Sequence, residues 1–201
     1  MIEKVSARKQ EVAARQARAS ATKEEAPAPK PKTLYLAGYD VFRADALEYG
    51  ERLRQACLRH GFVGLYPLDN AAPPELSGRA LAQWICEANI GLLRRADMVM
   101  ANLNPFRGAE PDSGTVFEVG YAAALGKSVW VYTASGASLI EQVATGRDGA
   151  RAVDAQGYTV EDFSLSLNLM IACSAQVVVG DAEDCLRRMA DAQSSLSPTW
   201  S

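Results

Sequence analysis

The amino-acid sequence predicts an α/β protein: a single doubly wound (flavodoxin- or Rossmann-like) domain with a five-stranded, mostly parallel sheet. From residue 33 onward, short apolar runs alternate with segments of helical length, which is the pattern of βαβ units around a parallel sheet. The 201 residues are 48% apolar and 22% charged, enough for one domain with its own core. We therefore expect one globular domain without internal repeats.

The expected strands are short and mostly rich in Val, Leu, Met or Tyr, as strands of a buried parallel sheet are. They span residues 33–37, 63–66, 97–103, 128–132 and 175–179. The segments between them have helical length and spacing. These cover residues 45–60, 79–96, 114–125 and 181–193. Gly61 and Gly126 follow the first and third helices, where glycine commonly ends a helix.

Two segments depart from this alternation. Residues 134–162 are rich in Gly, Ser, Asp and Arg and predict a long surface loop, which in a compact domain is usually functional or mobile. Residues 1–32 carry eight Lys or Arg against four Glu and almost no large apolar residue, so they cannot bury enough surface to offset their ordering entropy. We expect a disordered N-terminal tail at 1–32 and a domain at 33–201.

Composition also excludes several classes of function. No stretch approaches the roughly 20 apolar residues of a membrane-spanning helix, and the glycine-rich motifs of dinucleotide and ATP binding are absent after the first strand. The single histidine and the scattered cysteines make no convincing zinc site. We expect no metal, cofactor, membrane or nucleic-acid polymer, and a cytoplasmic protein with four cysteines buried in a reducing compartment. These are Cys57, Cys86, Cys173 and Cys185.

In an open parallel sheet, ligands bind beyond the carboxyl ends of the strands where the winding reverses. The residues after the first three expected strands are therefore of interest: 38–40, 67–70 and 104–108, the last leading to 112–114. The densest polar cluster there is ANLNPFRGAEPDSGTVFEVGYAAALGK, at residues 101–127.

Glu118 and Asp112 flank the start of a helix in this cluster. We expect the helix dipole and free amide groups to keep Glu118 ionised near neutral pH, and an ionised carboxylate is a competent nucleophile toward an anomeric carbon. The spacing of Thr115 and Glu118 also fits a capping box, and Asp112 or Ser113 could equally be the N-cap. On that spacing alone, capping is the more common role.

Asn89 is a second polar candidate because Ile85, Leu92 and Leu93 share its helix face, which would turn its amide toward the apolar side. A buried amide requires partners, so a core role and ligand contact have equal weight. Tyr35 in the first strand is by itself as typical of core.

Six dispersed motifs resemble the nucleoside 2-deoxyribosyltransferase family, from about Thr33 to the last helix. They are YLAG at 35–38 with Phe42, PLDN at 67–70, Asp97, ANLNPFRG at 101–108, DSGTVFEVGYAAALGK at 112–127 and LNLM at 167–170. Six motifs in the family's order are far more specific than any one. The resemblance implies an enzyme without cofactor that acts on 2-deoxyribonucleosides and free nucleobases.

The resemblance also implies residue roles. Glu118 corresponds to the nucleophile, Asp112 to a residue of the nucleoside site and Tyr35 to a tyrosine near the nucleophile. The substrate-binding candidates are Gly38, Phe42, Asp69, Asn89, Gly114, Asn168 and Met170. In the family, the Asn-x-Met pair completes the pocket of a neighbouring subunit, which implies a homo-oligomer.

The sequence departs from the lactobacillus-type members of the family at Asn89, where those enzymes carry an Asp. Asn can hydrogen-bond a base or sugar but cannot be a general acid. Protonation of the departing base would then fall to Asp112, water or the base's own tautomer. Base preference is therefore left open by the sequence.

The expected reaction is ping-pong transfer of 2-deoxyribose between nucleobases, with a covalent deoxyribosyl-Glu118 intermediate and retention. Two alternatives stay open. One is a deoxynucleoside 5-monophosphate N-glycoside hydrolase, in which water replaces the acceptor base; those relatives favour a serine and amide phosphate cradle where this chain has LNLM. The other is a non-catalytic nucleotide-sensing module with Glu118 as a helix cap only.

Overall fold

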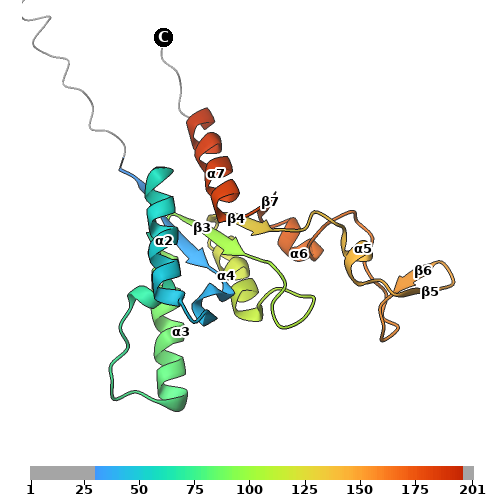
Figure 1. Cartoon of the computed structure of the whole chain (residues 1–201), viewed down its shortest axis with the longest axis horizontal. Coiled ribbons are helices and arrows are strands. Elements are labelled where there is room, and N and C mark those ends of the chain that lie inside the picture. The colour runs from blue at the N-terminus through green and yellow to red at the C-terminus, as the bar shows by residue number, and fades with distance from the viewer. Residues whose placement is uncertain (1–29, 197–201) are drawn as a thin grey trace, which may run out of the picture. The chain divides into compact units, whose positions relative to one another are not determined.

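The computed structural model describes residues 30–196 and confirms a doubly wound sheet of five parallel strands in the order β2-β1-β3-β4-β7 (Figure 1). The strands are β1 (Lys32–Ala37), β2 (Phe62–Leu65), β3 (Met98–Asn102), β4 (Ser128–Thr133) and β7 (Gln176–Val179). Every strand boundary lies within one residue of its expected position. The tail expected at 1–32 falls almost wholly outside the described residues, so its disorder stays a prediction.

Four long helices connect or follow these strands, as expected. They are α2 (Ala46–Arg59), α3 (Gly78–Arg95), α4 (Ser113–Ala124) and α7 (Ala182–Leu196). Gly61 and Gly126 follow α2 and α4 with φ of 80° and 69°. This left-handed conformation is the one that glycine adopts at little cost, which confirms both as helix-terminating residues.

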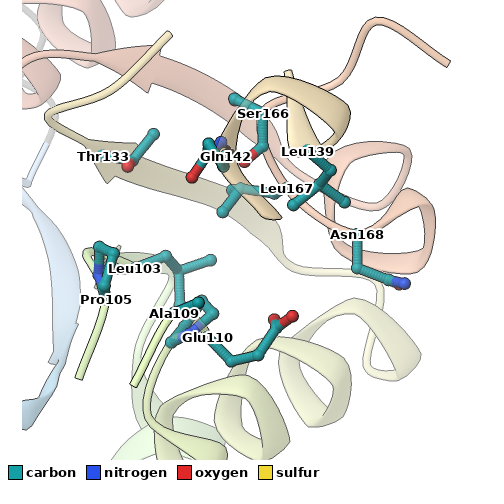
Figure 2. A pocket seen from close by; sticks show the side chains of 11 residues that line it. Leu103, Pro105, Ala109, Glu110, Thr133, Leu139, Gln142, Ser166, Leu167 and Asn168 are labelled. Atoms are coloured by element: carbon teal, nitrogen blue, oxygen red, sulfur yellow. Dashed lines mark hydrogen bonds between the residues drawn. The ribbon is translucent and has the colours of Figure 1, made fainter. Parts of the chain in front are cut away.

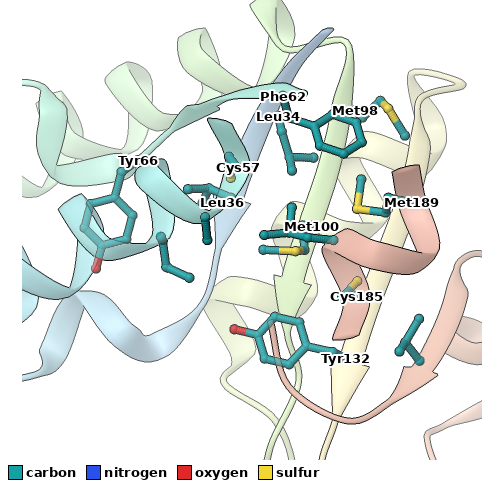
Figure 3. Packing of buried hydrophobic residues seen from close by; sticks show 14 residues of the cluster. Leu34, Leu36, Cys57, Phe62, Tyr66, Met98, Met100, Tyr132, Cys185 and Met189 are labelled. Atoms are coloured by element: carbon teal, nitrogen blue, oxygen red, sulfur yellow. The ribbon is translucent and has the colours of Figure 1, made fainter. Parts of the chain in front are cut away.

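The helices cover both faces of the sheet, each over its own apolar cluster. One cluster joins the sheet to α2 and α7, and the other joins it to α3, α4 and the short α6 (Leu169–Ala172). Successive strand residues point to opposite faces, so Leu34 and Leu36 enter the first cluster while Tyr35 and Ala37 enter the second. Figure 3 shows the first cluster, with Met100 of β3 near its middle.

The strand order fixes where a ligand site is expected. The chain passes from β1 to β2 on one side and then returns to place β3 on the other side of β1. The winding therefore reverses between β1 and β3, and ligands of this fold bind beyond the carboxyl ends of these two strands. The one-turn 3-10 helix η1 (Tyr39–Phe42) follows β1 at this point.

The long loop expected at 134–162 contains regular structure, so that expectation is wrong. Ser138 and Glu141 form a capping box at the start of α5 (Leu139–Val143), and β5 (Gly146–Asp148) pairs with β6 (Arg151–Val153) in an antiparallel hairpin. Figure 1 shows the hairpin beyond α5, away from the main sheet. Its strands bury no residue fully. Their sequence therefore has no alternation of apolar and polar residues from which strands could be predicted.

The expectation that all four cysteines are buried is half wrong. Cys57 and Cys185 are buried, whereas Cys86 on α3 and Cys173 after α6 are exposed, and all four are free thiols. Cys86 is exposed because only the last turns of α3, with Leu92 and Leu93, are buried. Across residues 30–196, none of the helices is long and apolar enough to cross a membrane.

Candidate active site

The centre of the candidate site is a hydrogen bond between β1 and α4. The Tyr35 hydroxyl donates to Oε1 of Glu118 over 2.5 Å. Burial raises the pKa of Glu118 to about 7; the hydrogen bond from Tyr35 opposes this rise and the charge of Asp112 adds to it. The expectation that the helix start keeps Glu118 ionised near neutral pH is therefore wrong, because burial outweighs any effect of the helix start on its pKa. Glu118 is the sixth residue of α4, beyond the free amides of the first turn, and desolvation dominates.

Tyr35 remains a hydrogen-bond donor in this pair. Its side chain is fully buried, and burial together with the neighbouring Glu118 raises the pKa of its phenol. The shared proton therefore stays on Tyr35 and orients one carboxylate oxygen of Glu118. Within residues 30–196, Oε2 of Glu118 has no hydrogen-bond partner, so this oxygen is available for attack.

Asp112 caps α4, which removes the capping role considered for Glu118. Oδ2 of Asp112 accepts hydrogen bonds from the backbone N and the Oγ1 of Thr115, both over 2.9 Å. Thr115 thus lies inside the first turn and is not the N-cap, so Thr115 and Glu118 do not form a capping box. A Cβ at Gly114 would lie 3.1 Å from the same Oδ2, so glycine leaves this carboxylate uncrowded.

A chain of polar contacts ties together the carboxyl ends of β1, β3 and β4. Asn102, only 4% exposed at the end of β3, donates to Oδ2 of the equally buried Asp40 over 2.8 Å. Its Oδ1 accepts from the Asn104 amide over 2.8 Å, and Oδ1 of Asn104 accepts from the backbone N of Ala134 over 2.8 Å. A Cβ at Gly38 would lie 3.0 Å from the Asn102 Cβ. The substrate-binding candidate Gly38 is therefore needed as a glycine because the backbone passes close to Asn102 at this point.

Asp40, Asn102 and Asn104 are not among the individual residues that the sequence predicted for the site. Asp40 and Asn104 fell within segments singled out because they follow strands, and Asn102 fell within the polar cluster at 101–127, but nothing in the sequence distinguished any of the three from its neighbours. Burial raises the pKa of Asp40, although its bond from Asn102 and the nearby Arg43 oppose the rise.

Aromatic side chains gather beside these loops. Phe42 of η1 stacks on Phe106 with ring centroids 5.5 Å apart, and Tyr39 stacks on the same ring at 4.7 Å. The Arg107 guanidinium lies 4.6 Å from the Phe106 centroid and 5.2 Å from that of Phe42. Phe42 is more than half exposed, so this layered surface can accept a planar ligand.

Two other candidates make no hydrogen bond to the Tyr35–Glu118 pair within the described residues. Asp69, in the 3-10 helix η2 (Pro67–Asp69), accepts from the backbone N of Tyr66 over 2.9 Å and pairs with Arg54, so local structure uses its carboxylate. Asn89 is half-buried, without a hydrogen bond to the described part of the chain. Ile85, expected to share a buried face with it, is 44% exposed, because the first turns of α3 are not packed on the sheet.

A small pocket lies between the end of β3, the loop before α4 and the segment before α6 (Figure 2). It is lined by Leu103, Pro105, Ala109, Glu110, Pro111, Thr133, Leu139, Gln142, Ser166, Leu167 and Asn168. Glu118 is not among these residues. Asn168 thus lines this pocket, which Glu118 does not.

Asn168 and Met170 are held in a defined but open arrangement. Oδ1 of Asn168 caps α6 by accepting from the backbone N of Met170 over 3.0 Å, and its amide donates to Oε1 of Glu161 over 3.0 Å. The Met170 side chain is 71% exposed. In the chain from residue 30 to 196, no group of three or more His, Cys, Asp or Glu side chains could hold a metal ion.

Comparisons with known proteins match the sequence and the fold to one family. A family model described as nucleoside 2-deoxyribosyltransferase matches residues 34–170. The solved structure of a 2-deoxyribosyltransferase from Leishmania mexicana is 35% identical, with a TM-score of 0.66 over 80% of this chain and 98% of that chain. A 2-deoxyribosyltransferase from Bacillus psychrosaccharolyticus shares the fold, at 19% identity and a TM-score of 0.52 over 76% of this chain and 88% of that chain.

Among curated proteins, an uncharacterised protein of Schizosaccharomyces pombe is 36% identical over 124 residues. These residues are 60% of this chain and 59% of the yeast protein. The match thus spans less than two thirds of that relative.

Proposed function

The chain belongs to the nucleoside 2-deoxyribosyltransferase family, whose enzymes act on N-glycosidic bonds, and we propose that it transfers 2-deoxyribose between nucleobases with Glu118 as the nucleophile. The observation that carries the proposal is the Tyr35–Glu118 hydrogen bond of 2.5 Å. It orients one carboxylate oxygen and leaves the other without a partner in the described chain. The similarity to the Leishmania mexicana 2-deoxyribosyltransferase supports the same substrate class.

The first half-reaction starts from ionised Glu118. Its free oxygen attacks the anomeric carbon of a bound deoxynucleoside, the C1′–N bond breaks, and the base departs with the bonding electron pair. Because burial raises the pKa of Glu118 to about 7, its carboxylate is poorly solvated and therefore more reactive than an exposed one. The product is a deoxyribosyl ester on Glu118.

The second half-reaction returns the sugar to a different base. A nitrogen of the acceptor base attacks C1′ from the face that the first base left and gives up its proton to water, the ester bond breaks, and Glu118 is regenerated as a carboxylate. Two inversions give net retention. Tyr35 keeps its proton throughout, because burial raises the pKa of its phenol. Its hydroxyl can donate to Glu118 both before the ester forms and as the ester bond breaks.

We also propose that the active enzyme is a homo-oligomer in which Asn168 and Met170 complete a neighbour's site. Two observations support it: Met170 is exposed, and α3 and α4 carry exposed apolar side chains, Ile85 and Phe117 respectively. Mixing inactive Glu118→Ala and Asn168→Ala proteins under verified subunit exchange tests this sharing. Recovered activity supports the proposal, and continued inactivity contradicts it.

One incubation separates transfer from the alternatives. The protein is given deoxyinosine with and without free adenine, beside a Glu118→Ala control. Formation of deoxyadenosine in the presence of adenine is the result expected of a transferase. Release of hypoxanthine at the same rate without adenine would instead identify a hydrolase. Neither product, with this purine pair or with a pyrimidine deoxynucleoside and base, would leave only a binding role. The control protein is expected to form neither.

A further inference from the structure

Arg107 occupies an unusual place beside the site. It follows β3 by five residues and has a φ of 57°, a left-handed conformation that is uncommon for a side-chain-bearing residue. Its guanidinium lies over the rings of Phe106 and Phe42. Two aromatic faces thus hold the charge beside the loops that follow β1 and β3.

The Arg107 guanidinium differs from that of nearby Arg43 in that it forms no ion pair within the described residues. Arg43, also near the carboxyl end of β1, pairs with Asp45 over 2.8 Å. Within residues 30–196, by contrast, no ion pair or hydrogen bond involves the Arg107 side chain, which lies against the two rings. A guanidinium stacked on its face keeps its N–H donors at its edge. These donors remain available to a ligand.

The proposed reaction places negative charge on the departing base, and a cation beside the base would stabilise it. The departing base receives the electrons of the C1′–N bond, yet Asn89 cannot act as an acid, Glu118 is consumed as the nucleophile, and Tyr35 donates to Glu118. None of these three groups offsets the charge on the base, and Oδ2 of Asp112 is held by two hydrogen bonds from Thr115 as the cap of α4. A preorganised cation near developing negative charge lowers the barrier to its formation.

We propose that Arg107 contacts the departing nucleobase and stabilises the negative charge that forms on it, a role that rests on the proposed deoxyribosyl transfer. The base stacks beside Phe42, and the guanidinium donates to one of its ring nitrogens or carbonyl oxygens. The C1′–N bond breaks as the bond from C1′ to Glu118 forms, and the base anion then takes a proton from water.

Two variants of Arg107 test the charge separately from the contact. Arg107→Gln keeps amide donors but removes the charge, and Arg107→Lys keeps the charge without the planar stack. Arg187→Gln is the matched control, since Arg187 is an exposed arginine of α7 paired with Asp184. Circular dichroism and thermal unfolding check that each variant folds. Base release is then measured in single turnovers for deoxynucleosides whose free bases differ in acidity.

Arg107→Gln is expected to slow base release by about tenfold for the most acidic base and by about a hundredfold for the least acidic, with much of the loss restored in Arg107→Lys and none seen in Arg187→Gln. An equal loss for every base, no loss, or a lysine variant as slow as the glutamine variant would each overturn the role. If the wild-type protein itself releases no base, the proposed function falls. If it releases base normally and the Arg107 variants fail these expectations, only this inference falls.

Discussion

Substituting the proposed nucleophile is expected to stabilise the fold above neutral pH. Burial raises the pKa of Glu118 from its ordinary 4.5 to about 7, so the folded protein binds the proton more tightly than the unfolded chain. Stability that depends on this proton is present below pH 4.5 and is lost as pH rises through 7. Glu118→Gln removes the ionisation and keeps an oxygen that accepts from Tyr35. The variant therefore avoids the loss.

The magnitude follows from the same two values. A rise from 4.5 to about 7, at about 1.4 kcal/mol for each pH unit, sets an upper limit of about 3.5 kcal/mol on the gain at pH 8. At pH 5 most of this difference disappears, because folded wild-type Glu118 is then protonated. Urea unfolding of both proteins at pH 5 and pH 8 measures the free energies of unfolding.

A matched control has the opposite sign. Hydrogen bonds from Ser138 lower the pKa of the exposed Glu141, so Glu141→Gln loses stability that is present above the ordinary pKa of a glutamate. The difference between Glu118→Gln and wild type should thus grow with pH, while that of Glu141→Gln has the reverse sign. A Glu118→Gln protein that is no more stable than wild type at pH 8, or a difference independent of pH, would refute the burial argument.

Two further predictions concern the neighbours of the nucleophile. In Tyr35→Phe, loss of the bond that lowers the pKa of Glu118 should move the rising limb of the kcat/KM profile from near pH 7 to higher pH, and an unmoved midpoint would count against the role given to Tyr35. In Asn102→Ala, Asp40 loses the bond from a buried amide, so the free energy of unfolding in urea should fall by about 1–3 kcal/mol; the prediction fails if Asn102→Ala unfolds like wild type.

Most of the fold was predictable because apolar runs indicate the buried strands and glycines follow the ends of two helices. The run Met98–Asn102 has five consecutive buried residues, as a central parallel strand requires, and Gly126 marks the end of α4 to within two residues. The β5–β6 hairpin was not predictable in this way. Its short strands are stabilised by their own pairing and not by a buried face, so their sequence carries no alternation.

The sequence predicted which residues form the candidate site better than it predicted their chemical state. The order of motifs indicated Glu118, Asp112 and Tyr35, and the structure joins Tyr35 to Glu118 directly. The state of Glu118 depends on burial by segments far away in the chain, so local reasoning about a helix start gave the wrong balance. Asp69 shows the same limit, since its partner Arg54 lies 15 residues away in sequence and is apparent only in three dimensions.

The most direct measurement of the central claim is mass spectrometry of the covalent intermediate. The wild-type protein is incubated with a 2-fluoro-2-deoxy nucleoside, whose fluorine slows turnover of the sugar ester, and is then digested. We predict a sugar adduct on the peptide that contains Glu118, absent in Glu118→Gln, together with loss of base exchange in that folded variant. A Glu118→Gln protein that exchanges bases at near wild-type rate, or an adduct on another residue, would contradict the mechanism.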